Sequence, residues 1–316
     1  MKEITSRSNP LWRDWMHQRS VAGRPGQLIW LDGQHLCQAW LAKRAQPLWA
    51  IFDQAKVNLP HLSTIRQQID HTRQVMMSSD LFDQLSTVKA AQGVLFLVEH
   101  AMTVTSSAKS QISVNSGIKA ITKASVQSES GIDAESVDRS ALRKSAQLQP
   151  SASSIGPGMF EFQRAVLLDS IQDPGNLGTI LRLSAAFGVS HVILGSGCAS
   201  AWSPKVLRSA QGAHFALTLV EVVDLVYWLK SYRQSVEDPA SVLATAVVDA
   251  QALCVSKLPQ RSIWLFGHEG QGVSPLLLDM ADIKVKIEHD QTVVDSLNVA
   301  SAAAICLFEQ SRQHSV

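Results

Sequence analysis

The stretch DSLNVASAAAICLFE, residues 295–309, decides how the rest of the chain is interpreted. It begins as a polar turn and continues as an apolar run whose spacing predicts a helix. Ser296 or Asn298 can cap this helix, because a short side-chain oxygen accepts hydrogen bonds from N–H groups that lack partners in the first turn. The run is apolar on nearly all sides until Glu309, which predicts burial. Four alanines near its start indicate close packing against another segment, although an ordinary well-capped core helix also explains the stretch.

Length and composition indicate a globular protein with two domains. The chain has 316 residues, of which 46% are hydrophobic and 17% charged. No apolar run is long enough to span a bilayer, and residues 1–15 lack the apolar core of a signal peptide, so we expect a cytoplasmic protein. The cysteines are scattered and predict buried free thiols, with neither a metal site nor disulfides. They are Cys37, Cys198, Cys254 and Cys306.

Charge is distributed unevenly along a chain whose net charge is +1. Residues 1–100 carry 11 basic and 8 acidic side chains (+3), whereas residues 161–316 carry 11 and 15 (−4). A basic front half is compatible with a polyanionic partner such as RNA, and an ordinary solvated surface explains it nearly as well.

Composition and periodicity predict that the chain is divided into three segments. Residues 1–100 alternate short strands and helices, which predicts a small α/β domain; Asn9-Pro10 starts a helix there, and Ser79 caps another. Residues 101–158 contain 14 serines and no aromatic residue, which predicts a flexible linker. Residues 159–316 alternate more clearly and predict a parallel sheet with helices on both faces. Predicted strands are 165–168, 191–194, 215–220, 242–248, 262–266 and 283–287, and predicted helices are 177–187, 204–210 (capped by Ser203), 225–232 and 275 onward.

Ligands of such sheets bind at the carboxyl ends of the strands, where three loops carry unusual residues. In the first, residues 169–182, Arg182 shares a helical face with Gly178. A glycine inside a helix is unfavourable by about 1 kcal/mol relative to alanine, so it indicates room for a ligand or for another backbone; a surface arginine on a helix that happens to hold a glycine is equally compatible.

The second loop, FGHEGQG at 266–272, places Glu269 between glycines that allow a ligand to lie against the main chain. It lacks the Lys-Ser/Thr ending of a phosphate-binding loop. Gly195-Ser196-Gly197 is an incomplete dinucleotide fingerprint, and a nucleotide-dependent enzyme with a Rossmann sheet is one alternative that it leaves open. The third loop, 287–298, leads into the opening stretch.

In this order and context, DPGNLGTILR (173–182), LFGHEGQGVS (265–274) and DSLNVASAAAI (295–305) resemble the three motifs of the SpoU (TrmH-like) family of RNA ribose 2′-O-methyltransferases, in the SPOUT superfamily. The resemblance covers residues 160–316. More loosely, Ile4-Thr5-Ser6, Asn9-Pro10 and Leu31-Asp32-Gly33 resemble the family's substrate-binding domain.

The resemblance implies transfer of a methyl group from S-adenosylmethionine to a ribose 2′-hydroxyl of RNA, ribosomal RNA rather than transfer RNA. It also implies a C-terminal trefoil knot, an exception to the usual absence of knots, and a homodimer formed through the C-terminal domain. The implied catalytic residues are Arg182, Asn176, Glu269, Ser296 and Asn298. The implied cofactor-binding residues are Gly267, Ile287, Leu297, Thr245, Ala246 and Phe266.

Arg182 is implied to lie at the reacting hydroxyl, and the sequence leaves two roles open. A guanidinium is normally a poor base, so Arg182 is either a strongly perturbed base or a cation that binds phosphate and stabilises the developing alkoxide.

Two departures from the family pattern occur. Residues 288–292 replace a shorter loop with a proline, and Leu183 stands where threonine is frequent. The rival from another class is a non-catalytic RNA-binding or ribosome-assembly protein with the same fold.

Overall fold

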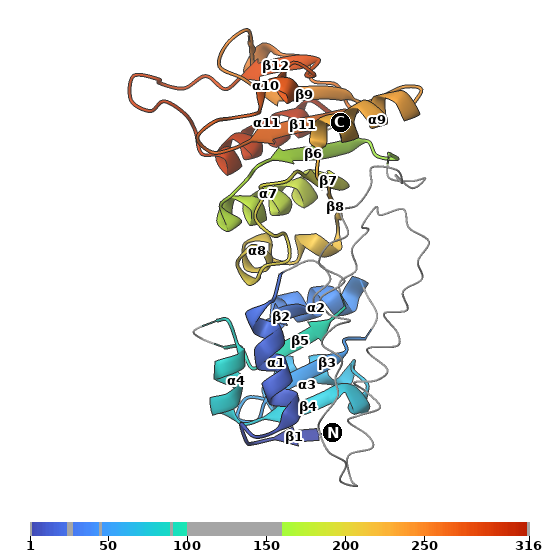
Figure 1. Cartoon of the computed structure of the whole chain (residues 1–316), viewed down its shortest axis with the longest axis vertical. Coiled ribbons are helices and arrows are strands. Elements are labelled where there is room, and N and C mark those ends of the chain that lie inside the picture. The colour runs from blue at the N-terminus through green and yellow to red at the C-terminus, as the bar shows by residue number, and fades with distance from the viewer. Residues whose placement is uncertain (1, 24–27, 44–45, 89–90, 100–159, 315–316) are drawn as a thin grey trace, which may run out of the picture. The chain divides into compact units, whose positions relative to one another are not determined.

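The computed structural model describes residues 2–23, 28–43, 46–88, 91–99 and 160–314. They contain two β-sheets, one in the front part of the chain and one after residue 160 (Figure 1). The predicted linker, 101–158, lies outside the described residues, so the linker and the three-segment division stay predictions.

The first sheet has five strands in the order β1-β4-β3-β5-β2. Only β5 runs antiparallel to its neighbours, which are β3 and β2. In chain order the elements are β1 (Lys2–Ile4), α1 (Pro10–Ser20), β2 (Ile29–Asp32), α2 (Gln34–Lys43), β3 (Trp49–Asp53), α3 (Pro60–Gln67), the 3-10 helix η1 (His71–Arg73), β4 (Gln74–Met77), α4 (Ser79–Leu85) and β5 (Val94–Val98). This arrangement is a small α/β unit, as the alternation of strands and helices predicts.

The predicted helix starts of the first domain have different outcomes. Asn9 caps α1 by accepting a hydrogen bond from the Leu11 N–H at 2.9 Å, with Pro10 at the first helical position, which confirms that prediction. The Ser79 cap is wrong, because α4 begins at Ser79 itself. Its hydroxyl instead donates to Asp53 at 2.6 Å.

The second sheet has seven strands in the order β10-β12-β9-β11-β6-β7-β8, and every pair of neighbours is parallel, as predicted. In chain order the elements are β6 (Arg164–Asp169), α7 (Pro174–Ala186), β7 (His191–Leu194), α8 (Pro204–Ala210), η3 (Ala213–Phe215), β8 (Thr218–Glu221), α9 (Leu225–Ser235), β9 (Ser241–Thr245), β10 (Gln251–Ala252), η4 (Leu253–Val255), β11 (Ser262–Gly267), α10 (Pro275–Leu278), β12 (Ile283–Lys286) and α11 (Val299–His314). Helix α7 packs against α8 and α11, whereas α9 packs against α10, so two groups of helices flank the sheet.

Two strand boundaries in this sheet differ from the predictions by three residues, and one predicted helix cap makes no hydrogen bond. Strand β8 begins at Thr218 because residues 213–215 form a 3-10 turn, and β9 ends at Thr245, before exposed Val247 and Val248. Ser203 occupies the N-cap position of α8, but its side chain makes no capping hydrogen bond.

Gly178 lies where helix α7 packs closely against helix α8. A Cβ atom added there would lie 2.4 Å from Cβ of Ser209 and 2.8 Å from the carbonyl oxygen of Val206, both in α8. Of the two alternatives, the close neighbour is therefore the backbone of another helix, and α7 and α8 approach at a distance that only glycine permits.

Helix α11 is capped by Asn298, whose Oδ1 accepts hydrogen bonds from Ala300 N at 2.9 Å and Ser301 N at 3.2 Å. The prediction that this helix is buried on nearly all sides is wrong. Ser301, Ile305 and Phe308 are exposed and share one stripe at helical spacing, and the last two retain 40% and 56% of their accessible surface. The helix packs against α7 and β11 with its other faces.

The predicted burial of all four cysteines is also wrong in part. Cys37 and Cys306 are buried and Cys198 is half-buried, but Cys254 is exposed, because its apolar neighbours form the short 3-10 helix η4 rather than a core strand. Within the described ranges, no helix combines the length and the apolar character that crossing a membrane requires.

Candidate functional site

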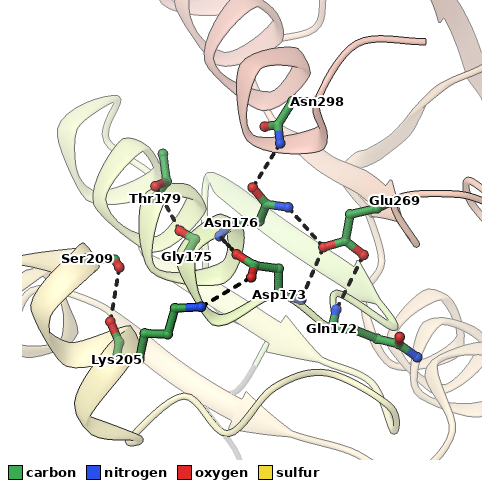
Figure 2. A network of polar contacts seen from close by, with 9 residues as sticks. All are labelled: Gln172, Asp173, Gly175, Asn176, Thr179, Lys205, Ser209, Glu269 and Asn298. Carbon is green, nitrogen blue, oxygen red and sulfur yellow. Dashed lines mark hydrogen bonds and ion pairs between the residues drawn. The ribbon is translucent and has the colours of Figure 1, made fainter. Parts of the chain in front are cut away.

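A chain of hydrogen bonds joins the three loops that the motifs single out, and Glu269 is its acceptor end. Strands β6 and β11 are parallel neighbours with Asp169 opposite Gly267, so the loops that follow them lie side by side. Glu269 Oε1 accepts from Asp173 N at 3.2 Å, and Oε2 accepts from Gln172 N at 3.4 Å (Figure 2). The carboxylate thus holds the loop after β6 against the loop after β11.

Two asparagines extend this chain to the start of α11. Asn176 Nδ2 donates to Glu269 Oε1 at 3.0 Å, and Asn298 Nδ2 donates to Asn176 Oδ1, also at 3.0 Å (Figure 2). Because Asn298 Oδ1 is the cap of α11 and a carboxylate accepts only, both amide orientations are determined by their partners. All donors therefore point toward Glu269. We call this set of hydrogen bonds, which joins Glu269 to Asn176, Asn298 and the backbone of Gln172 and Asp173, the Glu269 network.

The charge of Glu269 is stabilised by these contacts. Burial raises the pKa of Glu269, but the hydrogen bonds from Asn176 and from the backbone of Asp173 and Gln172 outweigh it, so the pKa lies below its ordinary value of 4.5. Asp173 caps α7 by accepting from Asn176 N at 2.9 Å, and this bond lowers the pKa of Asp173. Lys205 Nζ lies 3.4 Å from the other oxygen of Asp173, where both side chains are largely exposed.

The loop after β11 closes on itself at Gly267. A Cβ atom added to Gly267 would lie 2.1 Å from the carbonyl carbon and oxygen of Gly272, closer than any side chain allows. His268 and Gly272 form an antiparallel bridge across the turn, and Gly272 has φ +71°, a left-handed conformation that favours glycine. Gly267 and Gly272 therefore give this turn a backbone path that other residues cannot follow, and the contact of a ligand with this main chain stays a prediction.

A cavity of about 300 Å³ lies beside the Glu269 network, at the carboxyl ends of β9, β11 and β12. Of the predicted cofactor-binding residues, Thr245, Ala246, Gly267, Ile287 and Leu297 line it; Phe266 does not and is buried in β11. Of the predicted catalytic residues, Glu269 and Ser296 line it. Asn176 and Asn298 lie behind Glu269 in the network. The other lining residues are Val247, His268, Gly270, Gln271, Gly272, Val273, Lys286, His289, Gln291, Asp295, Val299 and Ala302.

Arg182 is not among the cavity-lining residues. It lies on α7 six residues beyond Asn176 and is exposed to solvent. Within the described part of the chain its guanidinium makes no hydrogen bond or ion pair, whereas every side chain of the Glu269 network is engaged. A guanidinium in this setting is available to an anionic ligand.

Two histidines of the cavity were not selected from the sequence. His268 Nδ1 accepts from Gly270 N at 2.9 Å and from Gln271 N at 3.2 Å, and His289 Nδ1 lies 2.9 Å from the carbonyl oxygen of Ile287. His268 directly follows Gly267, and His289 lies two residues after Ile287; these positions are the signal that could have found them.

Comparison with known proteins shows that this region is similar to a family of RNA-modifying enzymes. Residues 163–308 match the family model described as the SpoU rRNA Methylase family. The 23S rRNA guanosine-2′-O-methyltransferase RlmP of Bacillus subtilis is 37% identical over 150 residues, which cover 46% of this chain and 57% of that protein. The 23S rRNA guanosine-2′-O-methyltransferase RlmB of Nitrosomonas europaea is 33% identical over 158 residues, which cover 50% and 59%. The matches span little more than half of each relative.

Solved structures extend the likeness in fold to the whole chain. An rRNA methyltransferase from Sinorhizobium meliloti superposes with a TM-score of 0.69 at 20% identity and covers 100% of this chain and 99% of its own. The SpoU methyltransferase AviRb from Streptomyces viridochromogenes, solved with the cofactor AdoMet, has a TM-score of 0.68 at 20% identity and covers 96% and 98%.

Proposed function

We propose that this protein is a methyltransferase that uses S-adenosylmethionine to methylate a ribose 2′-hydroxyl of RNA; the match of residues 163–308 to the SpoU rRNA Methylase family supports this proposal. The observation that carries the proposal is the Glu269 network, which brings the three motif loops together at the edge of a cavity. A non-catalytic RNA-binding protein would need neither this directed chain of hydrogen bonds nor the cavity.

The cavity fits the cofactor in size and chemistry. Its volume of about 300 Å³ lies within the range of small-molecule sites, and Ile287, Leu297 and Val273 give it an apolar wall. Gly267 brings backbone to its surface without a side chain. When bound, S-adenosylmethionine supplies a methyl group on a sulfonium. We propose that Gly267, Ile287, Leu297, Thr245 and Ala246 hold it.

The chain's own residues would then position the substrate hydroxyl and stabilise its loss of a proton. The 2′-oxygen would gain the methyl group, the thioether of the cofactor would be the leaving group, and the hydroxyl proton would pass to Arg182 or to water. Arg182, with no competing partner among the described residues, would bind the adjoining phosphate and stabilise the developing alkoxide, or take the proton itself. Asn176, Glu269 and Asn298 would fix the loop geometry, and Ser296 would complete the wall.

The test is a methyl-transfer assay with the full chain, radiolabelled S-adenosylmethionine and total RNA. Arg182→Ala should reduce transfer by about 100-fold or more, the usual effect of removing a charge-stabilising donor. Cofactor affinity, measured by calorimetry, should stay within about threefold, because Arg182 does not line the cavity. Transfer at the wild-type rate by the variant would refute either role of Arg182, and a wild-type protein that does not bind the cofactor would refute the proposed function.

Ribosomal RNA is the proposed substrate. Relatives that match the C-terminal domain are 23S rRNA methyltransferases by name, and the front domain carries the +3 charge that suits a polyanion. We propose that residues 1–100 bind RNA and that residues 159–316 perform the transfer. Mapping ribose methylation in ribosomal and transfer RNA from cells without the gene distinguishes the two substrates. A cytoplasmic location stays a prediction.

A homodimer formed through the C-terminal domain is also proposed. Its support is the exposed stripe on α11, where Ile305 and Phe308 present apolar surface and the Phe308 ring lies 6.3 Å from that of Phe187, the C-cap residue of α7. Phe308→Lys should shift the protein from dimer to monomer in analytical ultracentrifugation. The trefoil knot stays part of this proposal, supported by the convergence of the loops after β9, β11 and β12 on one cavity.

A further inference from the structure

His268 is held by its own loop in one tautomer. A ring nitrogen that accepts a hydrogen bond carries no proton, and Nδ1 accepts two, from the backbone N–H groups of Gly270 and Gln271 at 2.9 and 3.2 Å. The proton of the neutral ring is therefore on Nε2. The loop's hydrogen bonds engage only Nδ1, and among the described residues Nε2 has no hydrogen-bond partner. His268 thus offers a free donor.

His289 is held in the opposite tautomer. Its Nδ1 lies 2.9 Å from the carbonyl oxygen of Ile287, which can only accept, so Nδ1 carries the proton. Nε2 of the neutral ring is then an acceptor. It is buried and has no hydrogen-bond partner in the described part of the chain. A buried acceptor without a partner is unfavourable, so this nitrogen is a candidate for a bond that a ligand completes.

Both histidines line the cavity beside the Glu269 network. We propose that they are specificity-determining residues for the cofactor: His268 donates a hydrogen bond to bound S-adenosylmethionine, and His289 accepts one from it. This inference rests on the proposed function. The cofactor offers both kinds of partner, since its carboxylate and adenine ring nitrogens accept, and its hydroxyls and exocyclic amino group donate. A ligand that satisfies both rings is fixed in orientation.

The competing explanation is that each ring only stabilises its own loop through Nδ1. Asparagine and glutamine separate the two explanations, because their terminal atoms reach different positions of the histidine ring. Asparagine places its polar atoms near Nδ1 and keeps the bond to the loop, but it has none near Nε2. Glutamine reaches the position of Nε2 and loses the bond to the loop.

The experiment uses the full chain and the variants H268N, H268Q, H289N and H289Q, with H35N, at an exposed position of the first domain, as the matched control. Isothermal titration calorimetry with S-adenosylmethionine gives each dissociation constant, and circular dichroism confirms that each variant is folded. We expect H268N and H289N to bind about 5- to 10-fold more weakly than the wild type, the effect of losing about 1 kcal/mol from one hydrogen bond. H268Q, H289Q and H35N should stay within about threefold.

The opposite order overturns the inference. If H268N and H289N bind as tightly as the wild type while H268Q and H289Q bind more weakly, both rings serve only their loops. If all four variants bind like the wild type, the cofactor contacts neither ring. If the wild-type protein does not bind S-adenosylmethionine, the first titration shows it before any variant is compared. That result would refute the proposed function itself.

Discussion

In each sheet an acidic side chain lies at or just beyond the carboxyl end of a strand, and its surroundings differ between the two sheets. Asp53 ends β3 in the first sheet, and Glu269 follows the end of β11 in the second. Asp53 is fully buried; it accepts from Ser79 Oγ at 2.6 Å and Ala55 N at 3.0 Å, and it pairs with Lys56 at 3.3 Å. Glu269 also accepts several hydrogen bonds, but it borders a cavity.

The difference shows that the carboxyl end of a parallel strand is not by itself a functional site. In the first sheet the partners of Asp53 come from the turn after β3 and from the first residue of α4, and they enclose it. In the second sheet the turn folds closely on itself at Gly267, and a cavity lies between the loops after β9, β11 and β12. An acidic side chain at the end of a strand stabilises the fold where the surrounding loops enclose it. It can contact a ligand where the loops leave a cavity beside it.

The largest effect expected from this comparison is that of Gly267→Ala. The new methyl group would lie 2.1 Å from the backbone of Gly272, so the turn must open and the cavity with it. We expect cofactor binding to fall below detection in calorimetry. Gly270→Ala is the control in the same loop, because its Cβ would meet no atom closer than 3.7 Å and should bind within about threefold of the wild type. Equal binding by both variants would contradict the importance of the turn.

The next effect is that of Asp53→Ala in the first sheet. The substitution leaves the Ser79 hydroxyl and the Ala55 N–H without their acceptor and Lys56 without its ion pair, which should lower the free energy of unfolding by about 2–4 kcal/mol. Urea unfolding monitored by tryptophan fluorescence measures this loss. Cofactor affinity per folded molecule should not change. A weaker affinity would mean that Asp53, like Glu269, belongs to a binding site.

The same contrast shows what the sequence predicts and what it cannot. Alternating apolar runs predict most strands of both sheets, because burial imposes a short period on the sequence. Seven of the site residues selected from the sequence line the cavity. The exposed stripe of Ile305 and Phe308 could not be predicted, because composition shows that a helix is apolar but not which faces its neighbours cover. Nor could the tautomers of His268 and His289, which depend on backbone atoms placed by the folded loops.

A smaller effect is expected for Asn298→Asp, which separates the two roles of this side chain. Aspartate is as good a cap as asparagine, so α11 should keep its start. The donor to Asn176 is lost, however, and a carboxylate would face the Asn176 oxygen at about the present 3.0 Å. We expect methyl transfer to fall by about 10-fold, with the melting temperature within about 2 °C of the wild type. If activity stays unchanged, Asn298 acts only as a cap.

The smallest effect concerns the pH dependence that the Glu269 network imposes on stability. Hydrogen bonds hold the pKa of Glu269 below 4.5 in the folded protein, so the folded state favours the charged form. Its contribution to stability is therefore complete above about pH 5, and it is lost as the pH falls below 4.5 and through the folded pKa. Urea unfolding of the wild type and of Glu269→Gln between pH 3.5 and 7 isolates this contribution, since glutamine does not titrate. The stability advantage of the wild type should be constant near neutrality and should shrink in acid. An advantage that grows in acid would mean that burial, which raises the pKa, outweighs the hydrogen bonds, and Glu269 would then resemble an acid enclosed in a core rather than one held charged at the edge of a site.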